Sequence, residues 1–514
     1  MRSKVYTFIH TYNATHDNGN EYTVSVRPED LVKTAKYVHR ELRGVVSSVF
    51  CSQERGGYTL VLVFSIRASG LFLMLQCHSV TPRFPAISPS MHAAAWFERE
   101  IQDLFGVTME GHLDPRPLML FPENWPIDKH PLRKDYPAGM RPEIASAEFA
   151  YQRVEGEGVY EIPVGPVHAG VIEPGHFRFS VAGEPIIKLE ARLFWKHKGI
   201  EKQFEEKAPL SMVALAERIS GDESFSHAFA YVHAVERICG VSVPLRAEYL
   251  RGIAAELERV SMHLFDIGNI CVGTAFNFGG ATLWRLKESL MRECERLFGN
   301  RFLRNVVLPG GVTRDVSGED LASLYKLLAR ILAEAESIIK IMQSSSSILD
   351  RLRTTAPLRR EEALDFGTVG VVARGSGIGF DARFHLPYSV YRIHRPNVVV
   401  ETDGDVQARI MVRVGELRES MRYIGTLIVA IPDGPVAAPV TGVDDGSALG
   451  WAEAPRGMVL FWVEMREEKL ARVKITSPSF LNWHAMPQAI SGMIIPDFPL
   501  LNKSFGLSYS GCDG

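Results

Sequence analysis

Residues 217–227 of the chain read Glu217-Arg218-Ile219-Ser220-Gly221-Asp222-Glu223-Ser224-Phe225-Ser226-His227. The last residues read Ser504-Phe505-Gly506-Leu507-Ser508-Tyr509-Ser510-Gly511-Cys512-Asp513-Gly514. Both segments are rich in hydroxyl and carboxyl groups, and Cys512 carries the only thiol in either of them. Soft transition metals are held by thiolates, whereas a serine hydroxyl is rarely deprotonated and a glutamate is a hard ligand. Together the two segments are therefore a poor donor set for such a metal.

The composition limits the classes of protein to consider. A length of 514 residues is enough for two or three domains, and 46% hydrophobic and 23% charged residues are ordinary globular values. The net charge of −3 gives no electrostatic reason to expect nucleic acid as a partner. Six cysteines that never form Cys-x-x-Cys suggest a reducing compartment. We see no signal peptide and no apolar run of about 18 residues, so a role at a membrane would depend on partner subunits.

The first 140 residues have α+β character. Residues 58–66 and 71–77 are β-rich apolar runs joined by a short turn, which predicts a hairpin. Residues 96–105 have helical spacing of apolar side chains. Residues 106–137 are rich in proline and histidine and predict an extended tail, and a linker is expected over 141–158.

The remaining residues, 159–514, form a second predicted domain that is mainly helical. Apolar residues recur at three- and four-residue steps over 245–264 and 321–341, and a third long helix is expected over 407–427. Residues 458–463 and 471–475 predict a second hairpin. The expected fold class is α+β: an N-terminal α+β domain followed by a helical domain with small β appendages.

The first domain resembles the 30-kDa subunit of respiratory complex I. The resemblance is carried by two motifs in the order and spacing of that family. The first comprises Glu98-Arg99-Glu100 and Asp103-Leu104-Phe105-Gly106, and the second is His130-Pro131-Leu132-Arg133-Lys134-Asp135-Tyr136-Pro137. It implies a docking module without a redox centre of its own.

The second domain resembles the 49-kDa subunit of complex I and the large subunit of energy-converting [NiFe] hydrogenases, which are related families. The matching segments are Gly165-Pro166-Val167-His168, Glu173-Pro174-Gly175-His176-Phe177, His197-Lys198-Gly199-Ile200-Glu201-Lys202, the run from Gly370 to Arg383, Arg472-Val473-Lys474 and Ser477-Pro478-Ser479-Phe480. Residues 217–227 resemble the first nickel-binding motif of the hydrogenases, E-R-[VI]-C-G-x-C-S-x-S-H, and the C-terminus resembles the second.

The resemblance also shows what is missing. Ser220, Glu223, Ser508 and Gly511 stand where the four nickel-binding cysteines would stand, and Cys512 is one residue out of register. The segment around Cys239 superficially resembles the first motif, but the residues after it match the family sequence that follows the true motif, so Cys239 is interpreted as an ordinary buried thiol. We therefore expect no metal bound by this chain.

In the related families these segments meet at one cavity that faces a [4Fe–4S] cluster of a partner subunit. The resemblance places eight residues near it: His168, His176, Glu201, Ser220, Glu223, His227, Ser508 and Asp513. Glu201, Glu223, His168, His227, His176 and Asp513 are the candidate catalytic residues; His168, Ser220, Ser508 and Gly511 are the candidate cofactor-binding ones. His168 matches the quinone-binding histidine of complex I. The tyrosine of the quinone clamp is absent, because Gly221 occupies its place.

Two interpretations of the carboxylates stay open. Glu201 matches a proton-carrying glutamate of the hydrogenases, and burial among apolar walls would raise its pKa towards neutrality. Glu223 would extend such a relay towards His227 or His168. Alternatively, both are satisfied polar residues of a vestigial pocket that stabilise helix contacts.

The resemblance implies an oxidoreductase or translocase subunit, inactive in isolation, of the NADH-quinone oxidoreductase or energy-converting hydrogenase type. Its partners would be a small subunit with a [4Fe–4S] cluster and membrane-embedded subunits related to complex I subunit 1 and to antiporters, at the cytoplasmic face of the inner membrane. A quinone is a candidate ligand. A structural connector and a working hydrogenase subunit are the alternatives. NAD binding would be inherited from the family name, because residues 375–379 lack the spacing of a dinucleotide-binding loop.

Overall fold

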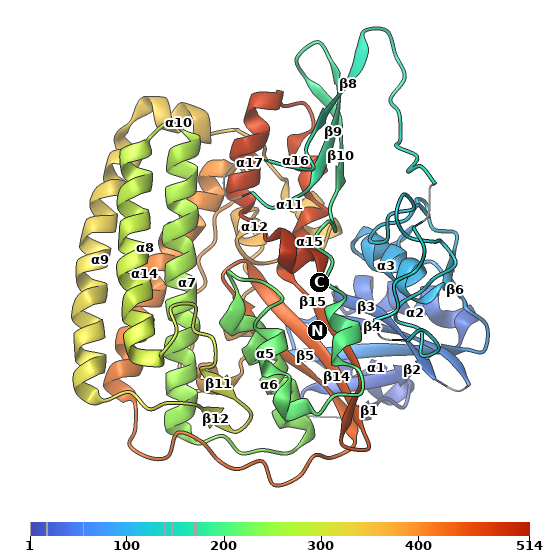
Figure 1. Ribbon diagram of the computed structural model, residues 1–514, viewed down its shortest axis with the longest axis horizontal. Coiled ribbons are helices and arrows are strands. Elements are labelled where there is room, and N and C mark those ends of the chain that lie inside the picture. The colour runs from blue at the N-terminus through green and yellow to red at the C-terminus, as the bar shows by residue number, and fades with distance from the viewer. Residues whose placement is uncertain (1, 17–18, 55, 138, 145–146, 169–171) are drawn as a thin grey trace.

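The computed structural model describes residues 2–16, 19–54, 56–137, 139–144, 147–168 and 172–514, so residues 145–146 of the expected linker lie outside it. Figure 1 shows an α+β part, coloured blue, packed beside a larger part built mainly of helices. This is the α+β arrangement that the sequence predicts. No helix in these described ranges has the length and apolar character needed to cross a membrane.

The N-terminal part contains a five-stranded sheet in the order β1-β2-β5-β4-β3, in which β2 and β5 are parallel and the other pairs antiparallel. Its strands are β1 (Thr15–His16), β2 (Glu21–Ser25), β3 (Val45–Glu54), β4 (Gly57–Ile66) and β5 (Leu71–Ser79). Its helices are α1 (Arg2–Thr11), α2 (Pro28–Glu41), η1 (His92–Ala94) and α3 (Ala95–Phe105). The predicted hairpin and the predicted helix over 96–105 are both confirmed. The predicted extended tail follows α3 and contains the short strand β7 (Thr108–Glu110), which pairs with β6 (Arg83–Pro85).

Five long helices form most of the second part, and α7 packs against three of the others, α6, α8 and α14. They are α6 (Ser224–Ile238), α7 (Leu245–Gly273), α8 (Asn277–Phe298), α9 (Gly318–Ser344) and α14 (Val406–Ala430). The three predicted helices are confirmed as α7, α9 and α14. Ser317 and Asp405 cap α9 and α14, since their side chains accept hydrogen bonds from backbone N–H groups of the first turn. The pattern predicts one apolar face for α7, but most of its charged residues, among them Arg251, Glu256 and Arg259, are buried too, because α7 packs against α6, α8 and α14.

The predicted late hairpin belongs to a three-stranded antiparallel sheet that lies between the two parts. Its strands are β13 (Gly446–Ala454), β14 (Gly457–Arg466) and β15 (Lys469–Thr476). One side packs against α6; on the other, the ring of Trp462 contacts that of Phe50 and the ring of Trp451 contacts that of Phe72, both in the N-terminal sheet. Buried side chains of both parts consequently form one continuous apolar core. The two parts are therefore packed together more closely than the two separate domains that the sequence predicts.

A second antiparallel sheet projects from the helical part at the top of Figure 1. It consists of β8 (Val159–Val164), β9 (His176–Ala182) and β10 (Ile186–Arg192). The short elements that complete the fold are α4 (Ile200–Phe204), η2 (Pro209–Ser211), α5 (Val213–Ala216), β11 (Val307–Leu308), β12 (Gly311–Val312), α10 (Ser346–Leu352), α11 (Arg360–Asp365), α12 (Gly370–Gly375), α13 (Ala382–His385), η3 (Ser389–Arg392), α15 (Pro478–Trp483), α16 (Met486–Ile490), η4 (Ile495–Asp497), α17 (Phe498–Phe505) and α18 (Tyr509–Asp513).

Candidate functional site

The loop before α6 and the C-terminal helix α18 lie against each other. The Oγ atom of Ser220 is 3.0 Å from the Oγ atom of Ser508. Ser508 caps α18 by accepting a hydrogen bond from the backbone N–H of Gly511 at 3.1 Å. A Cβ atom placed on Gly511 would point at both serines, 3.1 Å from the Ser508 side chain and 3.3 Å from the Ser220 Cβ. Three of the four positions that correspond to nickel-binding cysteines therefore face one another across 288 residues of chain.

The side chains at these positions do not fit a nickel–iron centre. The Ser220 hydroxyl donates a hydrogen bond to the carboxylate of Asp222. As metal ligands, both groups would offer only hard oxygen atoms. Cys512 is buried, but it lines a different cavity, described below, and burial raises its pKa well above the ordinary thiol value. Within the ranges that the structure covers, no cluster of three histidine, cysteine, aspartate or glutamate side chains could hold a metal ion. Thiolate ligation of nickel and iron is thus not available here.

Arg456, in the turn between β13 and β14, contacts the candidate site, and nothing in the sequence marks it as a site residue. Its guanidinium lies 2.8 Å from Asp222, 3.7 Å from Glu223 and 3.9 Å from Asp266, and its backbone N–H donates to Glu223 Oε1 at 3.1 Å. The segment Pro455-Arg456-Gly457 signals a turn between apolar runs. Nothing in it signals that the turn reaches the loop that precedes α6.

Glu223 is fully buried beside this arginine. Its Oε2 atom has no hydrogen-bond partner among the described residues. Burial raises the pKa of Glu223 to about 8, although Arg456 opposes the rise. The carboxyl can therefore hold a proton at neutral pH, which is the chemical property that the relay hypothesis requires.

The three candidate histidines make mostly local contacts. His227 bonds through Nδ1 to the Glu223 carbonyl oxygen at 2.9 Å, and burial lowers its pKa to about 4, so the ring is neutral. His168 Nε2 lies 2.7 Å from the Gly175 carbonyl oxygen, and His176 Nδ1 lies 3.3 Å from the Gly165 carbonyl oxygen. His168 and His176 thus link the described residues at the two ends of the connection between β8 and β9.

That connection nevertheless reaches the C-terminal helix. Glu173 accepts a hydrogen bond from the backbone N–H of Ser510 at 2.9 Å. Lys198, which replaces an arginine of the family pattern, donates to the carbonyl oxygens of Ile219 at 3.1 Å and Ser510 at 3.0 Å. A single ammonium group consequently ties the loop before α6 to α18.

Asp513 holds the end of the chain in place. Its carboxylate accepts hydrogen bonds from the backbone N–H groups of Phe194 and Lys196, both at 2.8 Å, and its carbonyl oxygen lies 2.6 Å from His197 Nδ1. It is fully buried, and burial raises its pKa to about 7. These contacts are those of a clamp that fixes α18 against the segment after β10.

We expect Asp513→Ala to release α18 and expose the neighbouring Cys512, which is 3% exposed in the intact fold. Two lost hydrogen bonds at roughly 1 kcal/mol each should raise maleimide labelling of Cys512 by about tenfold or more. Labelling is measured by mass spectrometry under native conditions. The buried Cys294 of α8 is the internal control and should keep its original rate. Unchanged labelling of Cys512 would show that other contacts hold the helix.

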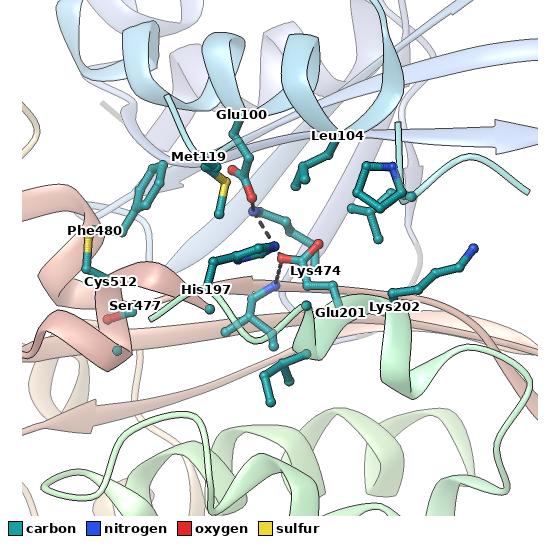
Figure 2. Close-up of a pocket in the computed structure, with 17 residues that line it drawn as sticks. Glu100, Leu104, Met119, His197, Glu201, Lys202, Lys474, Ser477, Phe480 and Cys512 are labelled. Carbon is teal, nitrogen blue, oxygen red and sulfur yellow. Dashed lines mark hydrogen bonds and ion pairs between the residues drawn. The ribbon is translucent and has the colours of Figure 1, made fainter. Parts of the chain in front are cut away.

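Glu201 lies apart from Ser220, Ser508 and Glu223, in a cavity of about 60 Å³ between the N-terminal part and the C-terminal helix (Figure 2). Its carboxylate is 2.6 Å from Arg472 and 3.2 Å from Lys474, and it accepts a hydrogen bond from the Ile475 N–H at 3.1 Å. Burial alone would raise the pKa of Glu201, but Lys474 and Arg472 outweigh it and hold the pKa below the ordinary value. The prediction of a raised pKa for Glu201 is therefore wrong.

Glu100 of α3 enters the same cavity from the opposite side, as Figure 2 shows. Its Oε1 atom lies 2.5 Å from the Lys474 Nζ atom, and its Oε2 atom has no hydrogen-bond partner in the described part of the chain. In the sequence, Glu100 is recognisable only as part of the family motif Glu98-Arg99-Glu100, which implies no role for it. Lys474 is 374 residues away, so no local pattern could have paired the two.

Comparison with known proteins gives matches over nearly the whole chain. Residues 24–142 match the family described as respiratory-chain NADH dehydrogenase, 30 Kd subunit, and residues 279–443 and 438–514 match the 49 Kd subunit. The chain is 31% identical over 507 residues to formate hydrogenlyase subunit 5 of Escherichia coli, covering 96% of this chain and 89% of that protein. It is 30% identical over 413 residues to a subunit of the NADH-quinone oxidoreductase of Phocaeicola vulgatus, covering 76% and 78%.

A solved structure is similar as well. It is a chain of the membrane-bound sulfane sulfur reductase, an archaeal respiratory membrane complex, with a TM-score of 0.66 and 26% identity. The match covers 70% of this chain and 99% of that one.

Proposed function

The chain belongs to the family of fused 30-kDa and 49-kDa complex I-type subunits that includes energy-converting hydrogenases, and from this we propose that it is a peripheral-arm subunit of an ion-translocating membrane oxidoreductase. Its relatives by name are subunits of a formate hydrogenlyase, an NADH-quinone oxidoreductase and a respiratory sulfane sulfur reductase. In this proposal the chain itself holds no metal. It receives its position from partners at the cytoplasmic face of the membrane and transfers protons, not electrons.

One observation carries the proposal: the hydroxyls of Ser220 and Ser508 touch at the place where the family pattern has thiolates. The fold that holds the two segments together is intact, with Lys198 and Asp513 fastening α18. The ligands that would make the site a nickel centre are replaced by oxygen donors. Beside them, Glu223 is buried next to Arg456 and can carry a proton at neutral pH.

We place the site formed by Ser220, Ser508 and Glu223 near a [4Fe–4S] cluster of a partner small subunit. On its membrane side we expect membrane-embedded subunits related to complex I subunit 1 and to antiporters. A quinone-like acceptor at this chain is the less favoured detail. Gly221 cannot supply the hydrogen bond of the missing tyrosine, and His168 already bonds to the Gly175 carbonyl oxygen. The alternatives are a structural connector without a local redox step and a hydrogenase-type subunit.

The test uses the assembled complex, purified from its membrane and reconstituted in liposomes. Nickel and iron are counted, and electron transfer from a reduced viologen dye is measured with protons, a quinone and a sulfane sulfur compound as acceptors. We expect iron from partner clusters, no stoichiometric nickel, and electron transfer to an acceptor other than protons that is coupled to ion uptake by the liposomes. One nickel per complex with hydrogen evolution would favour the hydrogenase alternative. Electron transfer without ion uptake by the liposomes would favour the structural-connector alternative. The absence of electron transfer to every acceptor tested would favour it too.

A further inference from the structure

We propose that Glu100, contributed by the N-terminal part, is the proton-exchanging carboxyl of the cavity between the two parts, and that Glu201 is the ionised group that positions Lys474 against it. This inference rests on the proposed role in proton handling. It assigns the exchange to a residue outside the domain that carries the hydrogenase-like motifs. Figure 2 shows the arrangement: Glu100 and Glu201 approach Lys474 from opposite sides.

The two carboxylates are not equivalent, because their hydrogen-bond donors differ. Glu201 is surrounded by Arg472, Lys474 and the backbone N–H of Ile475, which all stabilise its charged form. Glu100 has Lys474 alone, and its Oε2 atom lies buried without a partner among the described residues. A carboxyl oxygen that is buried and unpartnered is where a proton can reside at the lowest cost.

The charges around Glu100 agree with this division. Burial and the nearby Glu201 raise the pKa of Glu100 to about 7, and Lys474 opposes them most strongly, followed by Arg472. His197, Cys512 and Lys202 also line the cavity, and Lys202 forms an ion pair with Glu205 at 2.9 Å. Burial lowers the pKa of His197 and raises that of Cys512, so both are neutral around pH 7. Glu100 is thereby the cavity group whose charge changes near neutrality.

The cavity also provides an exchange partner for the proton. A volume of about 60 Å³ has room for a few water molecules, and Ser477 and His197 add polar groups to the carboxylates and the ammonium. When protonated Glu100 releases its proton, the O–H bond breaks, the electron pair stays on the carboxylate, and the proton passes to a cavity water. Lys474 stabilises the carboxylate left behind. Reprotonation reverses the step, and no oxidant or reductant is consumed.

The experiment compares Glu100→Gln with Glu98→Gln in the reconstituted complex. Glu98 lies on the same helix, is also fully buried, and also has a pKa raised to about 7 by burial. It is two residues away, so it points to another side of α3, and its carboxylate accepts hydrogen bonds from the N–H groups of Ile87 and Ser88. The two variants therefore remove the same kind of group at different places.

We expect Glu100→Gln to lower ion translocation by about 100-fold, a typical loss for a removed acid–base group, and to abolish the titration near pH 7 in its pH profile. Glu98→Gln should keep both, and Glu100→Asp should keep the titration. Infrared difference spectroscopy between pH 6 and pH 8 should show several protonated-carboxyl components, of which Glu100→Gln removes one and Glu98→Gln removes a different one. This signal does not require turnover.

The outcomes separate the two ideas. A complex that translocates ions with an unchanged pH profile in Glu100→Gln contradicts this inference and leaves the proposed function standing. A wild-type complex that translocates no ion contradicts the proposed function, and the infrared component that Glu100→Gln removes then decides alone whether Glu100 titrates in the cavity. A Glu100→Gln complex that does not assemble is replaced by Glu100→Asp, where a lost titration contradicts the inference.

Discussion

Replacing Arg374 by leucine is expected to lower the free energy of unfolding by about 3–5 kcal/mol, the range for breaking a buried ion pair from one side. Arg374 of α12 is fully buried and bonds to Glu416 of α14 at 2.6 Å and to Glu453 of β13 at 2.8 Å. Leucine fills part of the volume but leaves two buried carboxylates without their main cation. Urea unfolding of the purified chain, followed by far-ultraviolet circular dichroism, gives the difference.

The matched control is Arg418→Leu on the neighbouring helix α14. Arg418 also makes two bonds to a glutamate, Glu336, at 2.5 and 2.8 Å, but the two side chains are 44% and 38% exposed. Water and salt screen such a pair, so its loss should cost about 0.2–1 kcal/mol. An equal loss of unfolding free energy in the two variants would mean that the buried contacts of Arg374 with Glu416 and Glu453 stabilise the fold no more than an exposed ion pair does.

Arg374 also illustrates how far the sequence can be interpreted. The run from Gly370 to Arg383 is recognisable as a family pattern and contains Arg374, Asp381 and Arg383. Their partners cannot be inferred, because Glu256, Glu416 and Glu453 come from α7, α14 and β13. Periodicity predicts that α7 and α14 are helices; it does not predict that charged residues face inward on them.

The candidate site shows the same division. The resemblance to the related families implies that Ser220 and Ser508 meet, because the two corresponding segments of those families meet at one cavity, and the structure places the two hydroxyls 3.0 Å apart. It does not reveal which carboxylates the cations contact: Arg472 and Lys474 lie on β15 and belong to a family segment, and Arg456 lies in the turn before β14, but the sequence pairs none of them with Glu201, Glu100 or Glu223. The prediction for the pKa of Glu201 is wrong for that reason, since burial without its cations would have raised it.

A second large effect is expected in the pH dependence of stability, through Glu223. The carboxyl has a pKa of about 8 in the folded chain, against an ordinary value of 4.5, so the folded state binds its proton more tightly than the unfolded state. Its stabilising contribution is fully present below about pH 4.5 and is lost as the pH rises towards 8. Between these limits it should reduce the free energy of unfolding by up to roughly 1.4 kcal/mol per pH unit.

Glu223→Gln is expected to remove this slope, because glutamine resembles the protonated carboxyl and does not titrate. Urea midpoints at pH 5.5, 6.5 and 7.5 should therefore fall less steeply for the variant than for the wild type, with the largest difference at the highest pH. Glu319→Gln, at an exposed position near the start of α9, controls for the loss of one negative charge and should keep the wild-type slope. If the urea midpoint falls equally steeply with pH for the wild type and for Glu223→Gln, the folded state does not bind the Glu223 proton more tightly than the unfolded state does. Ion translocation left unchanged by the same variant in the assembled complex would remove Glu223 from the relay, and the carboxyl would then be a buried acid tolerated because Arg456 offsets part of its charge.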